Sequence, residues 1–157
     1  MNEEYTRLDR MRYTKNTTSS RLAILAIVFD VLFFISLYKS DVGSYYYTIL
    51  IGASIIYNLV FLLTAFLASE GVKNYQPVYS WVLVVLGVIQ IARIFIYPMQ
   101  AHGTQVGGAP VMGDAQFIRM IVYLVLSAVS LFASALINWQ KSSALAKHNA
   151  SLETAKA

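Results

Sequence analysis

The chain contains no cysteine, only three prolines, and few charged residues for its length of 157 residues. Without cysteine, disulfides, thiolate metal sites, cysteine nucleophiles and iron–sulfur clusters are all excluded. Charged side chains make up 13% of the chain, about half of the ~25% that is usual in a soluble globular domain. The low fraction of charged residues therefore argues against a water-soluble protein.

Apolar residues fill the chain instead and account for 57% of it. A soluble domain of this length could not bury so much apolar surface, whereas a bilayer solvates it. Four stretches approach the ~20 residues that a helix needs to cross a hydrocarbon core of ~30 Å. They cover residues 22–38, 45–69, 77–97 and 115–138. We therefore expect an all-α, polytopic integral membrane protein that folds as an antiparallel four-transmembrane-helix bundle.

The rest of the chain divides into two polar tails and three connections. A basic N-terminal tail, 1–21, and a C-terminal tail, 139–157, flank the membrane domain at 22–138. Two connections are short, which makes consecutive spans antiparallel neighbours. The third, 98–114, is long and glycine-rich, and it is the one loop with room for function. Tyr5, Leu8 and Met11 share a helical face in the N-terminal tail, which permits a weak interfacial helix.

The placement of lysine and arginine predicts the orientation of the chain in the membrane. With both tails inside, nine of these residues lie on the cytoplasmic side, and only Lys39, Arg93 and Arg119 lie nearer the outside. An even number of spans also puts both termini on one side. We therefore expect both termini in the cytoplasm, and the plasma membrane as the membrane that the protein spans.

Asp30 is the only acid inside a predicted span. Because insertion of an ionisable group costs about 2.5–3.5 kcal/mol, such a residue is a candidate functional site. It shares a helical face with Ala23 and Ala26, whose small side chains allow another helix to approach. In one interpretation, Asp30 couples the movement of a proton or cation. In the other, it holds the bundle or a partner subunit together through hydrogen bonds, and we favour this structural role. Its expected partner is Asn58, which lies at similar depth and can donate two hydrogen bonds.

Gln90 and Arg93 share a polar face of the third predicted span. Arg93 lies five residues before Pro98, so helix rise places it roughly 10 Å nearer the outside than Asp30. A direct ion pair between Arg93 and Asp30 is therefore not favoured, because the arginine would reach against its tendency to snorkel outward.

Arg119 lies at about the same predicted depth as Arg93, beneath the loop that contains His102. Two arginines at one level could line a vestibule for an anionic group. We favour the alternative, in which both arginines anchor the spans at lipid phosphates or pair with Asp41 and Asp114.

Serine residues follow helical spacing along the fourth predicted span. Ser127, Ser130 and Ser134 share one face, which indicates close packing against another helix. The opposite face is expected to meet lipid and to tolerate apolar exchange. It carries Met120, Leu124 and Leu131.

Catalytic motifs do not occur in the chain. His102 and His148 lie on opposite sides of the predicted membrane, so a histidine metal site or a histidine dyad is poorly supported. There is no phosphate-binding glycine motif and no HExxH. Asn16 begins a glycosylation pattern, which we interpret as a chance match in a cytoplasmic tail. We expect no enzyme activity, no cofactor, no metal and no nucleic-acid partner.

Two hypotheses for the function follow. In the favoured one, the chain is a non-enzymatic accessory or structural subunit of a larger membrane assembly, bound to another membrane protein or to a second copy within the lipid bilayer. In the alternative, it is a small oligomeric proton- or cation-coupled transporter or channel. That transporter would use Asp30, Asn58 and Gln90 around a central path.

Overall fold

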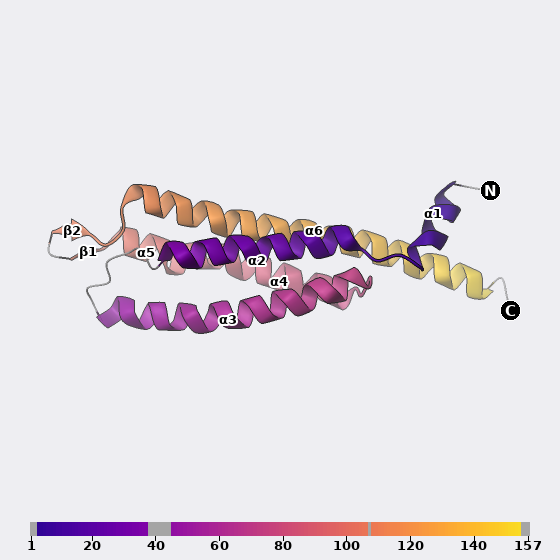
Figure 1. Ribbon diagram of the computed structural model, residues 1–157, viewed down its shortest axis with the longest axis horizontal. Coiled ribbons are helices and arrows are strands. Elements are labelled where there is room, and N and C mark those ends of the chain that lie inside the picture. Colours follow the sequence, from indigo (N-terminus) through magenta and orange to yellow (C-terminus); the bar gives the residue numbers. More distant parts are fainter. Residues whose placement is uncertain (1–2, 38–44, 107, 155–157) are drawn as a thin grey trace.

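Four long apolar helices form the body of the computed structural model, which describes residues 3–37, 45–106 and 108–154. They are α2 (Thr17–Leu37), α3 (Tyr45–Lys73), α4 (Val78–Ile96) and α6 (Asp114–Thr154). All four have the length and apolar composition that crossing a membrane requires. Figure 1 shows them antiparallel in chain order along one long axis. The predicted all-α bundle of four apolar, membrane-length helices is confirmed.

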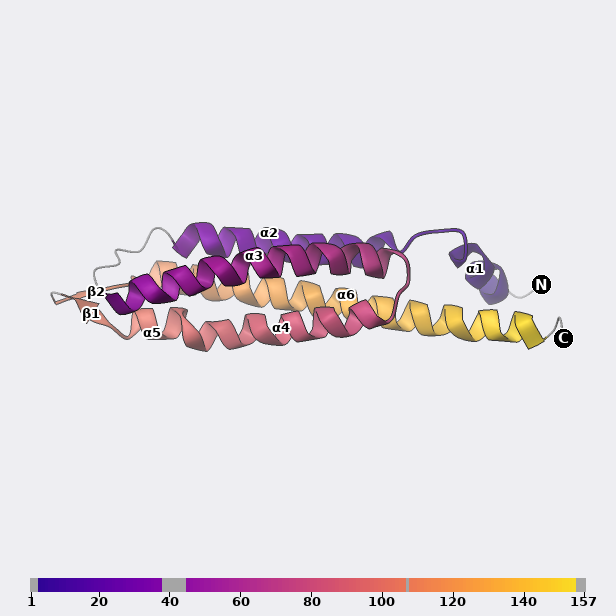
Figure 2. The same ribbon diagram turned by 90° about the horizontal axis from the view of Figure 1, so that it is seen from below.

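The last helix, α6, runs far beyond the predicted span. Its 41 residues correspond to about 60 Å of helix, roughly twice the thickness of a hydrocarbon core. The second half therefore projects past the other long helices (Figure 2). We expected a polar tail from residue 139 because the composition becomes polar there. The polar residues after 138 end the part of α6 that can lie in lipid. The helix continues because alanine, leucine, lysine and glutamate, which are frequent there, favour helix.

A short helix, α1 (Glu3–Met11), packs against this projecting part of α6. The ring of Tyr5 lies edge-on to the imidazole of His148, with ring centroids 4.8 Å apart. Asp9 Oδ1 lies 4.0 Å from Nε2 of the same histidine, whose side chain is buried. The N-terminal tail thus contains the helix that its sequence permits. This helix and the projecting part of α6 lie at the same end of the bundle (Figure 1).

The long connection after α4 closes the opposite end of the bundle. It contains a helix, α5 (Pro98–His102), and a short hairpin in which β1 (Gln105–Val106) pairs antiparallel with β2 (Ala109–Pro110). Val111 and Met112 then return to the bundle and are buried. Nε2 of His102 lies 2.8 Å from Asp114 Oδ1, and its ring stacks on Phe117. The loop that we expected to have room for function caps the helices.

Two apolar clusters fill the interior. The tail-side cluster is made of Ala23, Ala26, Phe61, Ala65, Ala68, Val72, Leu83, Leu86, Leu131 and Ala135. The hairpin-side cluster is made of Phe33, Leu37, Tyr97, Ala101, Val111, Met112, Met120 and Leu124. Alanines on α2 let α6 approach closely, and this pair of helices makes the most extensive contact in the bundle.

Serine side chains join α6 to α2. Ser134 Oγ donates to the carbonyl oxygen of Ser19 at 2.7 Å, and Ser19 Oγ donates to the carbonyl oxygen of Ser134 at 3.0 Å. Two turns further along both helices, Ser127 Oγ donates to the carbonyl oxygen of Ala26 at 3.0 Å. The two backbones are therefore held within hydrogen-bonding reach of each other's side chains.

The face of α6 that we expected to meet lipid instead faces the interior, so that expectation was wrong. It carries Met120, Leu124 and Leu131, which are all fully buried. With Ser127 and Ser134 these residues follow spacings of four and three, which place them on one helical face. Ser130 lies beside this face, and its hydroxyl donates to the carbonyl oxygen of Leu126 in its own helix. The packing face of α6 thus mixes serines with large apolar side chains.

A second set of hydrogen bonds closes the bundle at the tail end. Asn138 Nδ2 donates to Ser80 Oγ at 2.8 Å and to the carbonyl oxygen of Gln76 at 3.0 Å. Asn138 Oδ1 accepts from Asn16 Nδ2 at 3.2 Å, and the backbone nitrogen of Asn16 donates to the carbonyl oxygen of Lys73. Asn16, which we interpreted only as part of a chance glycosylation pattern, is 1% exposed. It connects the start of α2 to the end of α3 and to α6.

Replacing Ser134 with leucine should destabilise the protein by about 1–3 kcal/mol, because added bulk at a tight helix contact forces the backbones apart. Ser134→Ala should cost only about 0.6 kcal/mol for the lost hydrogen bond. Val129→Leu is the matched control, since Val129 lies on the exposed side of α6. Thermal unfolding in detergent measures all three variants. Equal effects of leucine at positions 134 and 129 would contradict the assignment of the packing face.

Candidate functional site

The polar centre of the bundle is an ion pair between Asp30 of α2 and Arg93 of α4. Nη1 of Arg93 donates to Asp30 Oδ1 at a distance of 2.6 Å. Asp30 is fully buried and Arg93 is 8% exposed. A buried ion pair is stable only if its remaining polar atoms also find partners, because removing two charges from water is costly. The neighbouring side chains supply most of these partners.

Gln90, one turn before Arg93 on α4, links the pair to α6. Its Nε2 donates to Asp30 Oδ1 at 2.8 Å and to Ser127 Oγ at 3.1 Å. Its Oε1 accepts from Arg93 Nη1 at 2.8 Å. Because Ser127 also donates to the backbone of α2, these contacts join three helices at one level.

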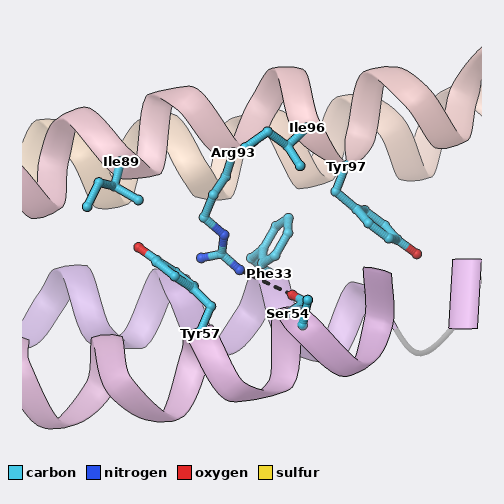
Figure 3. A pocket seen from close by; sticks show the side chains of 8 residues that line it. Phe33, Ser54, Tyr57, Ile89, Arg93, Ile96 and Tyr97 are labelled. Atoms are coloured by element: carbon cyan, nitrogen blue, oxygen red, sulfur yellow. Dashed lines mark hydrogen bonds between the residues drawn. The ribbon is translucent and has the colours of Figure 1, made fainter. Parts of the chain in front are cut away.

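The remaining long helix, α3, contacts the same group of polar side chains through Arg93. Nη2 of Arg93 donates to Asn58 Oδ1 at 2.7 Å and to Ser54 Oγ at 3.5 Å. The guanidinium lies over two rings, with centroids at 4.5 Å for Phe33 and 4.3 Å for Tyr57 (Figure 3). Its edge therefore makes hydrogen bonds while its faces contact aromatic rings, as a planar cation allows. We call Asp30, Ser54, Asn58, Gln90, Arg93 and Ser127 the central polar layer.

The expectation that Arg93 does not pair directly with Asp30 was wrong. We ended the third span at Tyr97 and placed Pro98 in the loop, but the chain continues directly into α5 and remains helical to His102. Arg93 thus lies nine residues before that end, or about 14 Å of helix rise. Asp30 lies seven residues before the end of α2 at Leu37, or about 10 Å. The two side chains therefore start from similar depths.

Asn58 is buried in the central polar layer, but it does not make the contact that we expected. It was predicted to donate to Asp30, whereas its oxygen accepts from Arg93. An amide carries both a donor and an acceptor. A hydrogen bond from a cation is stronger than one between neutral groups, which favours the amide orientation with oxygen towards the guanidinium.

The vestibule of two arginines, which was the less favoured alternative, does not form. Arg93 points into the bundle, so neither the vestibule nor the lipid anchor describes it. Arg119 lies apart from the central polar layer and is exposed. His102 contacts Asp114 instead of an anion site. Asp41, the other acid considered as a partner, lies outside the described residues. The anchoring role of Arg119 stays a prediction.

Phe33 and Tyr57, which cover the guanidinium, were not recognised from the sequence. Each lies close in sequence to a polar residue, three positions after Asp30 and one before Asn58. Aromatic residues are frequent in this chain, so proximity alone does not mark them. The available signal is their position on the faces of α2 and α3 that also carry the polar residues.

Two cavities lie on either side of α3 at the level of the central polar layer. The α3–α4 cavity, of about 190 Å³, is lined by Phe33, Ala53, Ser54, Tyr57, Ile89, Arg93, Ile96 and Tyr97 (Figure 3). The α2–α3 cavity, of about 280 Å³, is lined by Asp30, Val31, Phe34, Ile55, Asn58, Leu59 and Leu62. In Figure 1, α3 diverges from the other helices towards the hairpin end. The polar layer is thus bordered by mainly apolar space.

Among the described residues, no group of three or more histidine, cysteine, aspartate or glutamate side chains could hold a metal ion. No family model, curated protein or solved structure matches the chain. Fold and site together define a polytopic helical membrane protein whose helices are joined by a buried polar network. Its particular role has to be argued from that geometry.

Removing one member of the ion pair should destabilise the protein by about 3–5 kcal/mol, because the other charge remains buried and unpaired. We therefore expect Arg93→Met and Asp30→Leu each to lower the unfolding temperature strongly in detergent. The double variant should be more stable than the sum of the two single effects predicts. Arg119→Met, at an exposed arginine, is the control. Additive single effects would show that the two residues are not energetically coupled.

Proposed function

We propose that the protein is a non-enzymatic accessory or structural subunit of a larger membrane assembly. The observation that carries the proposal is the pairing of Asp30 with Arg93 inside the chain itself. Apolar clusters lie on both sides of this pair, towards the tail end and towards the hairpin end. Such an arrangement suits a stable scaffold, because a conducting path needs polar or hydrated groups along its length.

The proposed contact surface is the tail platform, which consists of α1 and the projecting part of α6, residues 139–154. Crossing the membrane does not require this extension, since the preceding part of α6 already exceeds ~20 residues. The platform exposes basic side chains, among them Arg7, Arg10 and Lys147. A partner with an acidic cytoplasmic surface would complement it.

We propose further that the tail platform is cytoplasmic and that the membrane is the plasma membrane. The nine-to-three distribution of lysine and arginine supports this orientation. The common position of α1 and the end of α6 agrees with it, since both tails then lie on one side.

Single-cysteine labelling tests the orientation directly, because the natural chain has no cysteine. Gln105→Cys, at an exposed residue of β1, should react in intact cells with a membrane-impermeant maleimide. Lys147→Cys, on the tail platform, should react only after permeabilisation. Each position serves as the control for the other. Labelling of Lys147→Cys in intact cells would reverse the proposed orientation.

Purification from native membranes in mild detergent tests the subunit role. We expect the 17.5 kDa chain to purify in a complex with a second, different chain at fixed stoichiometry. Arg10→Glu should release most of that second chain at physiological salt, because it reverses a charge on the platform. Arg119→Glu makes the same change at the other end and should retain it. Native mass spectrometry measures both. A second chain retained equally by both variants would contradict the platform.

The transporter is the second candidate, and one observation favours it: Asp30 lines a cavity as well as pairing with Arg93. Asp30→Asn removes the titratable group while keeping its shape. Under the subunit proposal, purified wild type and Asp30→Asn should show the same background proton and cation flux in lipid vesicles. Flux that requires Asp30 would replace the subunit with a transporter.

A further inference from the structure

Two polar atoms of the central polar layer have no hydrogen-bond partner among the described residues: Asp30 Oδ2 and Asn58 Nδ2. The other polar atom of each group, Oδ1, binds Arg93 on the side of α4. Both residues line the α2–α3 cavity, whereas Arg93 lines the cavity on the other side of α3. Asp30 and Asn58, which carry the two unpartnered atoms, thus both belong to the wall of the α2–α3 cavity. One is an acceptor and the other a donor.

Leaving a buried polar atom without a partner is unfavourable, because the atom loses its hydrogen bond to water and gains none in return. Asp30 is fully buried and Asn58 is 4% exposed, so water on the surface of the protein does not satisfy them. A molecule inside the cavity would recover this free energy by bonding both atoms at once.

The remaining walls of the α2–α3 cavity are apolar and are formed by Val31, Phe34, Ile55, Leu59 and Leu62. Val31 and Leu59 are also exposed on the outside of the bundle, between α2 and α3. The cavity therefore opens sideways, where the bilayer surrounds the helices. Its volume of about 280 Å³ exceeds the roughly 150 Å³ of an apolar cavity that holds benzene. Apolar walls with a few convergent polar groups are the usual form of a small-molecule site.

We propose that the α2–α3 cavity binds a neutral, hydroxyl-bearing apolar molecule that reaches it from the bilayer. The ligand hydroxyl donates to Asp30 Oδ2, and its oxygen accepts from Asn58 Nδ2. A hydroxyl suits the pair because a single oxygen atom both donates and accepts. A metal cation does not, because Asn58 offers N–H groups on this side. An anion is disfavoured by the carboxylate. The site goes beyond the subunit role and does not depend on it.

The test uses the purified full chain in phosphatidylcholine nanodiscs, with 4-propylphenol as probe and 4-propylanisole as its methyl ether. The two probes share an apolar body, but only the phenol can donate to Asp30. Empty nanodiscs correct for partition into lipid. Saturation-transfer NMR should show saturable binding of the phenol, and binding of the ether should be at least about tenfold weaker, which corresponds to about 1.4 kcal/mol.

Two variants locate the site. Val31→Phe fills the mouth of the cavity and should abolish saturable phenol binding. Val28→Phe adds the same bulk one turn earlier on α2, at an exposed residue that does not line the cavity, and should leave binding unchanged. Neither residue belongs to the central polar layer, and thermal unfolding confirms that each variant folds.

Several results would overturn the proposal. Equal binding of phenol and ether would mean that the cavity recognises apolar bulk alone. Absence of saturable phenol binding would mean that water occupies the polar end. Equal binding by Val31→Phe and Val28→Phe would place the probe elsewhere. The comparison of phenol with ether on the natural chain needs no variant, so it decides the matter even if Val31→Phe does not fold.

Discussion

The contact between Arg93 and Asp30 is the constraint on which the rest of the bundle depends. A charge within hydrocarbon is costly unless an opposite charge and hydrogen bonds compensate for it. Each helix therefore has to present a particular residue at one depth. On α3 this is Asn58, whose oxygen binds the guanidinium, and on α6 it is Ser127, which binds Gln90. These contacts fix the rotation and the height of all four helices relative to one another.

Polar contacts fix the register of the helices, and small side chains allow the helices to pack at a short distance from each other. In lipid no hydrophobic force draws apolar helices together, so close packing and interhelical hydrogen bonds must hold them. The reciprocal bonds between Ser19 and Ser134 show how near α2 and α6 come. Asn138 and Asn16 repeat the arrangement at the tail end, where side chains and backbone of all four long helices meet. Two polar levels, with an apolar cluster between them, give one arrangement a clear advantage over slipped alternatives.

One part of the helix α3 packs tightly into the bundle, whereas another part borders cavities. Its tail half contributes to the tail-side cluster, while cavities lie on both of its sides at the level of Asn58. The ion pair is therefore closed along the bundle axis but is bordered laterally by apolar space. In the proposed subunit role, the central polar layer stabilises the scaffold and the tail platform provides the contact with a partner. The α2–α3 cavity would then let a neutral molecule of the bilayer bind without disturbing the ion pair.

The sequence by itself determined the number of membrane-length helices, because the thickness of a bilayer sets the length of an apolar run that can cross it. It also identified Asp30, Asn58, Gln90 and Arg93, since polar residues are conspicuous in apolar runs. Only the tertiary structure decided how they pair, because depth depends on where each helix actually ends, and α4 passes Pro98 into α5. On α6 the serines indicated part of the buried face, since Ser127 and Ser134 do contact α2, but the sequence did not show that large apolar residues share that face. A helix that is apolar on nearly all sides has no polar face to mark its direction, so packing against its neighbours decides which side is buried.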